Sequence, residues 1–451
     1  MRNKTINMTE GTPWKQIFRF SLPVYGGLLL QQLYHTVDTI IVGNFAGETS
    51  LSAVGTTGVF TYLFLAVAVG FSAGAGVLIS QLFGAGDREG LVRHAAVGIR
   101  LLLRIGLIVT VVGLALTGPV FRHLLNVQES YLNGALVYSR IYLSGLLFQF
   151  GYNIVAALLR SMGDSKASLY FLMISSGINI VLDLLFVAGF GLGVAGAAVA
   201  TVIAQAGSCF ASFRYLWKRY PEFRYSKDNW QYDRDIASGI VRQGIPITLQ
   251  QMIASLGLLF VQRVVNGFGQ AMTASYTVAM RIETYIRMPI STVQVAMATY
   301  TGQNIGAGNM KRVEQGMRQG LLLAFAMTGV LAFLAITFSH PIIGLFGISE
   351  AAEAFCSEHI RVTALAMLVL AGYMPILGVF QGAGDGYAVT RTSIFALVVR
   401  VLSAYTLYNR EPFGYRIVWY CILFGFIGGF TITWIHYLRG TWRNKRALKR
   451  A

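Results

Sequence analysis

Long apolar segments separated by short polar connections run along the whole chain. Each segment has the length of about 20 residues that carries an α-helix across a bilayer. Twelve such windows fall at about 16–42, 51–80, 91–117, 133–159, 168–189, 192–217, 239–265, 272–299, 315–338, 356–380, 389–408 and 416–438. The pattern therefore predicts an all-α polytopic membrane protein with twelve transmembrane helices.

Composition excludes a soluble protein of this size. Hydrophobic residues make up 55% of the 451 residues and charged residues only 12%. The cysteines Cys209, Cys356 and Cys421 all lie in apolar windows. They predict neither a disulfide framework nor a thiolate metal site. The chain has no phosphate-binding loop, HExxH pair or nucleophile elbow, so we expect no enzyme activity and no cofactor.

The net charge of +17 would suit a nucleic-acid partner, but its distribution indicates membrane topology instead. Lys and Arg gather in the amino-terminal segment, in the connections that lead from even to odd windows, and in the tail. The alternate connections hold Arg122, Arg410 and Arg416. By the positive-inside rule both termini should be cytoplasmic in an inner (plasma) membrane protein. The bilayer is thus an expected partner, and nucleic acid is not.

The second half of the chain repeats the first. Residues 80–87 (SQLFGAGD) match 302–309 (GQNIGAGN), Gly163-Asp164 match Gly384-Asp385, and 21–24 (SLPV) match 244–247 (GIPI). We therefore expect an amino-terminal six-helix lobe at 1–217, a cytoplasmic linker at 218–238, a carboxyl-terminal six-helix lobe at 239–438 and a basic tail at 439–451. Two six-helix repeats insert with one orientation and enclose a cavity, as transporters do. We expect a monomer.

The first window carries a polar stripe. Gln31, His35 and Asp38 are spaced i, i+4 and i+7, so they share one face of a helix. An ionised carboxylate facing lipid would cost at least about 2.5 kcal/mol. The stripe must face other helices or a water-filled cavity. Asp38 is therefore a candidate functional residue, with a structural polar seam as the alternative.

A second group of polar residues lies in the fifth and sixth windows. Asn179 and Asp183 are spaced i, i+4, and Thr201 lies in the next window at a depth similar to that of Asp38. We expect these four side chains to form one cluster. Two neighbouring carboxyl groups do not both ionise readily, so the cluster could take up and release a proton, or bind Na⁺. A satisfied polar network without ion traffic is the alternative.

The second lobe lacks these acids, because the repeat places Val261 opposite Asp38 and Ala404 opposite Asp183. Ion coupling is thus expected in the amino-terminal lobe. Glu283 lies near Arg281 and Arg287, which favours a structural ion pair, with a role in the substrate cavity as the alternative. Arg400 is also expected to be paired and could favour an anionic substrate.

Proline and aromatic residues add candidates for movement and for the cavity wall. Pro23 lies in the same window as Asp38 and removes a helix hydrogen bond, so it is a candidate hinge. Tyr34 and Tyr152 belong to a set of aromatic and Met residues that could line an adaptable cavity. Ordinary packing is the alternative for most of that set.

These features resemble the multidrug and toxic compound extrusion (MATE) family over essentially the whole chain. The resemblance rests on the two six-helix halves, the turns at 81–86 and 303–308, the segment 160–164, and Asn179 with Asp183. It implies a cation-coupled antiporter that alternates between inward- and outward-open states and expels organic cations, drugs or other amphipathic toxic compounds.

The DinF-like branch of that family is the most similar. Asp38, Asn179, Asp183 and Thr201 match its amino-lobe cation site, Gln31 matches a polar position and Pro23 a helix kink. Another branch has acids in the seventh and tenth spans, where this chain has Gln250, Gln251 and residues 372–374 (GYM). That departure favours coupling through the amino lobe. H⁺ or Na⁺ remain the alternative coupling ions, and a flippase for lipid-linked or amphipathic molecules is the alternative function.

Overall fold

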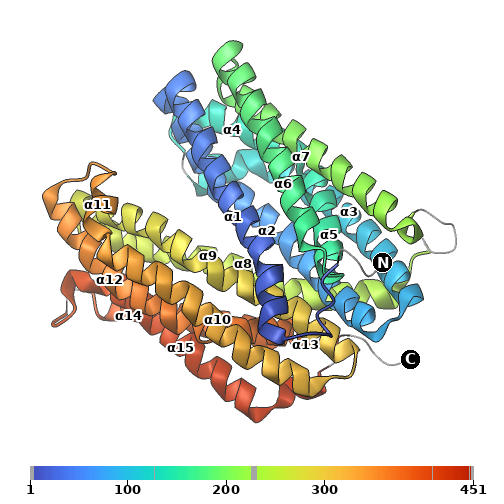
Figure 1. Cartoon of the computed structure of the whole chain (residues 1–451). Coiled ribbons are helices and arrows are strands. Elements are labelled where there is room, and N and C mark those ends of the chain that lie inside the picture. Colours follow the sequence, from blue (N-terminus) through green and yellow to red (C-terminus); the bar gives the residue numbers. More distant parts are fainter. Residues whose placement is uncertain (1–4, 126, 225–230, 409, 446, 448–451) are drawn as a thin grey trace. The chain divides into compact units, whose positions relative to one another are not determined.

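The structure is a computed structural model that describes residues 5–125, 127–224, 231–408, 410–445 and 447. The described residues form helices and no strand, so the predicted all-α class is confirmed (Figure 1). The α-helices are α1 Pro13–Ile41, α2 Gly47–Ala85, α3 Arg88–Pro119, α4 Glu129–Ser144, α5 Leu146–Ser161, α6 Ser165–Asp183, α7 Gly193–Arg219, α8 Arg234–Asn266, α9 Gln270–Gly306, α10 Met310–Thr337, α11 Ser339–Gly344, α12 Glu350–Ala371, α13 Met374–Ala383, α14 Gly386–Thr406 and α15 Ile417–Arg439.

Short segments of other helical geometry join some of these helices. Three of them are wide π-turns: η1 Val42–Ala46, η2 Val120–Leu124 and η3 Leu184–Gly189. Three are tighter 3₁₀ turns: η4 Pro221–Phe223, η5 Gly414–Arg416 and η6 Thr441–Asn444. The π-turns η1 and η3 directly follow α1 and α6, the two helices that carry the predicted acids.

Every predicted window falls on a helix or a helix pair. Window 133–159 is split at Gly145 into α4 and α5, which meet at 46°, and window 356–380 is split into α12 and α13 before Pro375. Among the described residues, nine helical runs are long and apolar enough to span a bilayer, or ten with the bent pair α4 and α5. One of the nine runs, Pro13–Ala85, contains both α1 and α2.

The outer faces of these helices suit lipid. On α3 the side chains of Leu107, Ile108 and Val111 are 57–62% exposed, and on α10 Leu322 and Phe333 are 69% and 67% exposed. Apolar surface of this extent would be unfavourable in water. The chain is therefore a multi-pass membrane protein.

The chain forms two compact units. The first contains Pro23–Phe83 and Asp87–Thr248, and the second contains Asn7–Leu22 and Leu249–Ala451. The division thus falls inside α1, just before Pro23, and inside α8, just after Thr248. The domain limits expected from sequence lie elsewhere, in the linker 218–238, and remain a prediction. Residues 225–230 of that linker, and 446 and 448–451 of the tail, lie outside the described residues.

Small residues let helices approach closely within the first unit. A Cβ atom at Gly74 of α2 would lie 2.6 Å from the backbone nitrogen of Gly244 in α8. Real Cβ contacts are not this short, so the two backbones touch directly. Membrane helices often pack through small residues in this way. This contact holds the first half of α8 against α2.

The repeated turns have matching geometry in the two halves. Gly86 and Gly308 both have a φ of 74°, in the left-handed region that glycine adopts most easily. The next residues, Asp87 and Asn309, begin α3 and α10. Their side chains accept hydrogen bonds from the backbone N–H three residues later, at 2.8 and 3.2 Å. The sequence repeat is therefore also a repeat of local structure.

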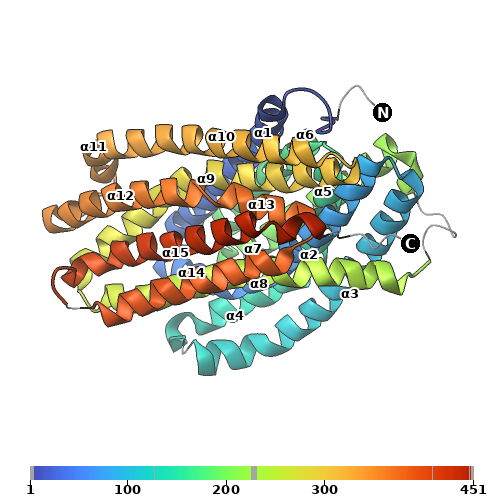
Figure 2. The same ribbon diagram turned by 90° about the horizontal axis from the view of Figure 1, so that it is seen from below.

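A second pair of turns extends the repeat to the last helix of each half. Asp164 accepts a hydrogen bond from the Tyr215 hydroxyl on α7 at 2.8 Å. Asp385, at the equivalent turn, lies 2.8 Å from Nε2 of His436 on α15. Figures 1 and 2 show α14 and α15 side by side in the second unit. Each buried aspartate thus ties the start of one helix to the helix that ends its half.

The Asp385 pair should make stability depend on pH. Burial acts to raise the pKa of Asp385, but the hydrogen bond and charge of His436, with Lys445, outweigh burial and hold the pKa below its ordinary value. A carboxylate with a lowered folded pKa stabilises the fold above its unfolded pKa and loses that effect as pH falls through the folded pKa.

We expect Asp385→Asn to lower the free energy of unfolding at neutral pH by about 1–3 kcal/mol, the range for a hydrogen bond to a charged group. The difference in the free energy of unfolding between Asp385→Asn and the wild type should become smaller below about pH 4. Thermal unfolding in detergent across pH measures both. Asp164→Asn is the matched control, because its partner Tyr215 is a neutral hydroxyl. If the difference in stability between Asp385→Asn and the wild type does not change with pH, the charge of Asp385 does not contribute to stability through His436.

Candidate functional site

The first unit brings Asp38, Asn179, Asp183 and Thr201 to one place. Asp38 lies on the last turn of α1, before η1, and Asp183 is the last residue of α6, before η3. The segments η1 and η3 pack on each other and on α7, which carries Thr201. Figure 1 shows α6 and α7 side by side. Wide π-turns are uncommon and occur frequently at functional sites.

These four side chains are buried, with exposed fractions of 6% for Asp38, 1% for Asn179, 0% for Asp183 and 5% for Thr201. The Asn179 side-chain amide donates to Oγ1 of Thr201 at 3.4 Å. The Thr201 hydroxyl in turn donates to the carbonyl of Ala197 at 3.0 Å. The amide and the hydroxyl are therefore fixed in orientation by α7.

The two carboxyl groups lie within hydrogen-bonding reach of each other. No described residue donates a hydrogen bond to Oδ1 of Asp38, to either carboxyl oxygen of Asp183, or to Oδ1 of Asn179, although all four oxygens are buried. A buried acceptor without a donor costs about 1–3 kcal/mol. Two adjacent carboxylates also repel. A proton shared between the carboxyl groups, or a monovalent cation among the four oxygens, would remove both penalties.

Tyr34, a candidate from the sequence, lies near the acids together with Tyr138, Tyr142 and Gln205, which sequence reasoning missed. The hydroxyl of Tyr34 approaches that of Thr201, and the hydroxyl of Tyr142 approaches Gln205. Tyr138 and Tyr142 on α4 stack with ring centroids 6.3 Å apart. The i, i+4 spacing of Tyr138 with Tyr142, and of Thr201 with Gln205, is a signal in the sequence that could have indicated them.

An apolar cluster closes the site on the side of η1 and η3. Its buried members are Ile41, Val42, Tyr138, Val187, Ala197 and Ala198. Low local polarity strengthens every electrostatic interaction of the two acids. The charge state of the pair therefore carries a large energetic weight in this unit.

The remaining candidate residues lie in different surroundings. Gln31 and Tyr34 are half-buried, whereas His35 is exposed, so the polar stripe of α1 has only one buried member, Asp38. Tyr152 is buried on α5, near Arg160, and Pro23 lies within the unbroken α1.

Glu283 belongs to the second unit and is 7% exposed. The expectation that it forms an ion pair with Arg281 or Arg287 was wrong, since none of the ion pairs among the described residues includes it. The reason is position: both arginines are exposed, and the Glu283 carboxylate is buried with Oε2 unpaired. Arg400, which was also expected to be paired, likewise forms no ion pair among the described residues.

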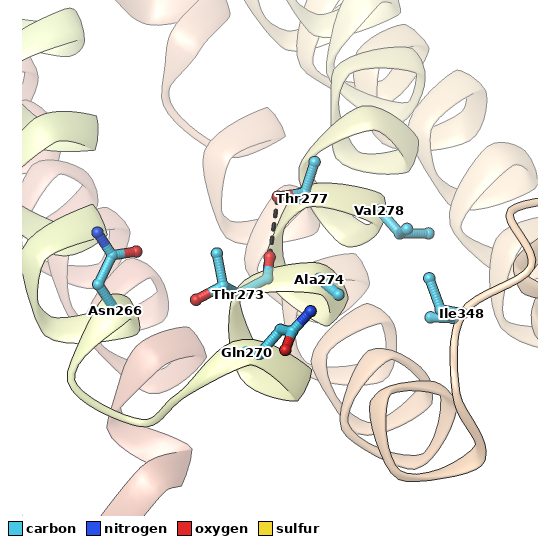
Figure 3. Close-up of a pocket in the computed structure, with 7 residues that line it drawn as sticks. All are labelled: Asn266, Gln270, Thr273, Ala274, Thr277, Val278 and Ile348. Carbon is cyan, nitrogen blue, oxygen red and sulfur yellow. Dashed lines mark hydrogen bonds between the residues drawn. The ribbon is translucent and has the colours of Figure 1, made fainter. Parts of the chain in front are cut away.

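A surface hollow of about 600 Å³ lies in the second unit, whereas Asp38 and Asp183 belong to the first (Figure 3). It is lined by Asn266, Gln270, Thr273, Ala274, Thr277, Val278 and Ile348. These side chains are neutral, so the hollow does not supply the charge that ion coupling needs. Among the described residues, no three His, Cys, Asp or Glu side chains gather as transition-metal ligands do.

Two segments of the chain, residues 23–185 and 246–406, match the family model MatE. The chain belongs to the MATE family. The two matched segments each begin at the repeated proline-containing entry and end in the fifth or the eleventh window. This agrees with the internal repeat. A MATE protein is a transporter, which accords with the absence of enzyme motifs.

Relatives of this MATE protein cover nearly its whole length. The "Probable multidrug resistance protein YoeA" of Bacillus subtilis is 28% identical over 89% of each chain. A crystal structure titled "MATE in complex with MaL6" superposes with a TM-score of 0.90 at 28% identity over 98% of each chain. The "outward-facing conformation of a multidrug resistance MATE family transporter" superposes with a TM-score of 0.89 at 27% identity, again over 98% of each chain.

The adjacent acids predict a pH effect on the stability of this MATE protein. If the native pair holds a proton that the unfolded chain releases, stability falls as pH rises. We expect the thermal midpoint of the wild type to fall between about pH 5 and pH 9. Asp183→Asn should flatten that fall, because an amide donates to the Asp38 carboxylate without needing a proton.

Thermal unfolding of the purified protein in detergent measures this effect. Glu129→Gln, an exposed acid on α4, is the control. Stabilisation by Na⁺ but not by K⁺ at high pH would identify a sodium ion rather than a proton at the pair. If the thermal midpoints of the wild type and of Asp183→Asn depend on pH in the same way, neither a shared proton nor a sodium ion stabilises the pair.

Proposed function

We propose that this MATE protein is a cation-coupled antiporter that exports organic cations, drugs or other amphipathic toxic compounds. The observation that carries the proposal is the pair Asp38 and Asp183, which lie in contact within one unit and have three buried oxygens without a donor among the described residues. Such a pair is stabilised by taking up a proton or Na⁺, because either removes the repulsion between the carboxylates and satisfies their oxygens. The multidrug relatives support the class of substrate.

Coupling requires that the ion binds with different affinity in two conformations. In this structure Asp38 is one turn from η1, and Asp183 adjoins η3. A change in the charge of the pair acts first on these two wide turns, a local geometry that is rare and frequent at functional sites. We propose that ion binding from outside stabilises the conformation that releases substrate to the outside, and that ion release to the cytoplasm resets the transporter.

The same proposal locates coupling in the amino-terminal lobe, with Asp38, Asn179, Asp183 and Thr201 as its residues. It assigns Gln31, Tyr34, His35 and Tyr152 to the substrate cavity or the coupling network. The match of the four coupling residues supports membership of the DinF-like branch. We also propose that the protein acts as a monomer in the plasma membrane with both termini cytoplasmic, since Lys and Arg gather on that side.

Transport of a fluorescent organic cation into proteoliposomes under an imposed H⁺ or Na⁺ gradient tests this function. We expect Asp38→Asn and Asp183→Asn each to reduce gradient-driven transport by about tenfold or more, the range of typical coupling energies. Glu129→Gln should leave it unchanged. The gradient that drives transport identifies the ion.

Two outcomes would contradict the proposal. Undiminished gradient-driven transport in both aspartate variants would remove the coupling role of the pair. Scrambling of labelled lipid without movement of the organic cation would favour the flippase instead. Substrate binding to each variant is measured by fluorescence. A variant that binds substrate normally but does not transport it has lost coupling rather than substrate binding.

Pro23 is proposed as the hinge of α1. It stands at the border where α1 passes from the second compact unit to the first. Proline removes one backbone hydrogen bond and weakens the helix at that point. Its repeat counterpart, Pro246, lies two residues before the corresponding border in α8. If the two units move, a helix that belongs to both of them must bend near the border between them, where the proline lies.

Pro23→Ala restores the helix hydrogen bond and should stiffen α1. We expect transport to slow by a few-fold while the affinity for substrate and the identity of the driving ion stay unchanged. Rates and half-saturating concentrations in the same proteoliposomes measure this. Pro119→Ala, at the end of α3, is the control proline. An unchanged rate in Pro23→Ala would exclude the hinge.

A further inference from the structure

A short segment before α1 is bound to the second compact unit, although it belongs to the first half of the sequence. The backbone N–H of Met8 donates to Oε1 of Gln303 at 3.0 Å, and the side-chain amide of Asn304 donates to the carbonyl of Met8 at 3.1 Å. Met8, Gln303 and Asn304 are all 0% exposed, the last two near the end of α9. Side chains of α9 therefore satisfy both polar groups of the Met8 backbone.

Arg312 on α10 binds the same segment. Its Nε donates to the carbonyl of Met8 at 3.3 Å, and its Nη2 donates to the carbonyl of Glu10 at 2.6 Å. The guanidinium lies over the ring of Tyr300, 5.8 Å from the ring centroid, and the Tyr300 hydroxyl donates to the carbonyl of Arg312 at 2.9 Å. A planar guanidinium is pre-organised to donate several hydrogen bonds at once. Tyr300 thus fixes Arg312 in the position from which it binds the segment.

The segment has a turn of its own before it enters α1. The side-chain oxygen of Asn7 accepts hydrogen bonds from the backbone N–H and the hydroxyl of Thr9, at 3.1 and 2.7 Å. Gly11 has a φ of 71°, in the left-handed region that glycine adopts most easily. Asparagine and glycine are typical turn residues for these reasons. Residues 7–12 therefore form a defined local structure.

The first turns of α1 are held in the same way. The backbone N–H of Trp14 donates to Oε1 of Gln319 at 2.8 Å, where the start of α1 lies beside α10 (Figures 1 and 2). The first N–H groups of a helix have no partner within the helix, so this side chain takes the place of a cap. Ile17 and Phe20, spaced i, i+3, are 0% exposed. The chain is therefore fixed to the second unit as far as the last turn before Pro23.

The internal repeat separates the side chains that bind this segment from those that build the turn at the end of α9. Gln303 has an equivalent in the first half, Gln81. The other three binding residues, Asn304, Arg312 and Gln319, correspond to Leu82, Gly90 and Val97. These three equivalents have no side chain that forms hydrogen bonds, yet the turn has matching geometry in both halves. Binding of the segment is what the three polar side chains add in the second half.

We propose that residues 7–14 are a strap that fixes the start of α1 to the second unit and thereby makes Pro23 the point where α1 bends. This inference rests on the hinge proposed above, and it adds the fixed side that a hinge requires. A helix that is free at its start turns as one rod when the rest of it moves. A helix whose start is held must instead bend where its hydrogen bonding is weakest, which is at the proline. The four side chains that hold the strap are then positioning residues, because they act on transport only through α1.

A distance measurement on the purified full-length protein tests whether the strap holds α1. Spin labels are placed at Lys15→Cys on α1 and at Gln315→Cys on α10, two exposed positions of the second unit. The three native cysteines are buried, so the introduced thiols react first. Double electron–electron resonance should give one narrow distance distribution between about pH 5 and pH 9, the range over which we expect the acidic pair to change its charge.

The variant Asn304→Leu/Arg312→Gln removes the side chains that donate to the carbonyls of Met8 and Glu10. Leucine is the residue of the first half at the equivalent position, so this change suits the end of a helix that has the same turn. We expect the width of the distance distribution to rise about twofold or more, because the start of α1 then opens locally from α10.

Two further variants complete the distance measurement. Arg318→Gln removes an exposed arginine from the same helix, α10, and should leave the distribution as narrow as in the wild type. Gln319→Val, which again inserts the residue of the first half, removes only the hydrogen bond to Trp14 and should widen the distribution less. If the double variant does not fold, Gln319→Val decides the question.

The transport rate in proteoliposomes measures the effect of the strap on the hinge. Pro23→Ala is expected to slow transport while the strap is bound. In the background of Asn304→Leu/Arg312→Gln we expect Pro23→Ala to cause no further slowing, because a released helix no longer has to bend at that point. Two changes that act through one hinge are not additive. A merely structural role of the strap would lower the rate and leave the effect of Pro23→Ala as it is in the wild type.

Two results would overturn the proposal. One is a distance distribution that stays narrow in both Asn304→Leu/Arg312→Gln and Gln319→Val, because other contacts then hold α1. The other is an equal effect of Pro23→Ala with and without the strap side chains. The distance measurement needs no substrate and no gradient. The strap can therefore fail that test while antiport is confirmed, and antiport can fail while the strap passes it.

Discussion

Two carboxyl groups in contact, inside a helical lobe that crosses a membrane, cannot both be charged without a positive partner. In this protein the constraint falls on Asp38 and Asp183, whose buried oxygens receive no hydrogen bond from the described residues. Water cannot solvate them freely, and no described arginine or lysine pairs with them. The lobe therefore contains a group that a proton or a cation would stabilise, and π-turns directly follow the helices that carry both acids.

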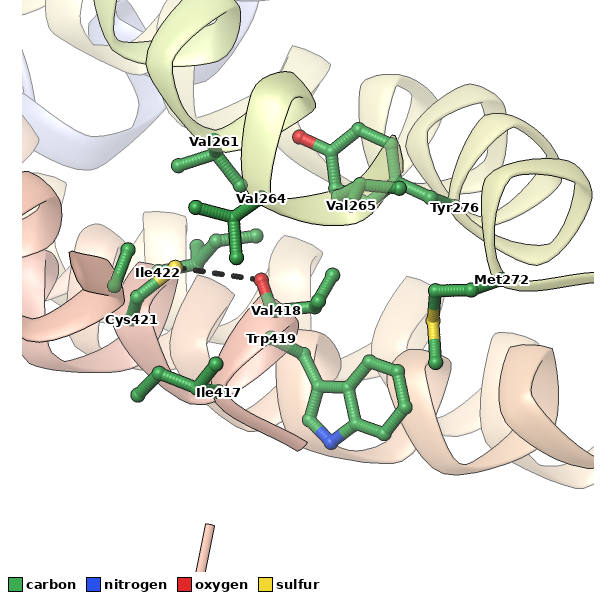
Figure 4. Packing of buried hydrophobic residues seen from close by; sticks show 11 residues of the cluster. Val261, Val264, Val265, Met272, Tyr276, Ile417, Val418, Trp419, Cys421 and Ile422 are labelled. Carbon is green, nitrogen blue, oxygen red and sulfur yellow. Dashed lines mark hydrogen bonds between the residues drawn. The ribbon is translucent and has the colours of Figure 1, made fainter. Parts of the chain in front are cut away.

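The two halves share a scaffold but not a chemistry. The turns at Gly86 and Gly308 have one conformation, and Asp164 and Asp385 each fix the helix that ends their half. Yet Val261 and Ala404, which stand where the first half has Asp38 and Asp183, lie in the apolar cluster of Figure 4 with exposed fractions of 0% and 1%. Duplication preserved what positions the helices, because capping and packing are needed in both halves. The chemistry diverged, and the proposed mechanism needs only one ion site, in the amino-terminal lobe.

The sequence predicted the parts of this structure that depend on local rules. Helix windows follow from apolar length, and the cluster of Asp38 with Asp183 follows from the cost of placing acids in lipid. The stripe of Gln31, His35 and Asp38 was expected to face other helices or a water-filled cavity, and the sequence did not indicate which of its members is buried; in the structure this is Asp38, while His35 is exposed. Sequence reasoning also paired Glu283 with Arg287 from spacing alone. Spacing gives the distance between Cα atoms, whereas the direction of a long arginine side chain is decided by tertiary packing.

The borders of the two compact units explain why prolines lie where they do. The chain passes from one unit to the other at Pro23 in α1 and just after Thr248 in α8. A regular helix would make each crossing rigid, because bending it breaks several hydrogen bonds at once. Pro23 and Pro246 have already removed one bond near each crossing, so a change of angle there costs less than elsewhere in the same helices. Charge at Asp38 and bending at Pro23 act on a single helix, α1. In the proposed mechanism the segment between them would transmit a change at one position to the other, without requiring any further mobile part.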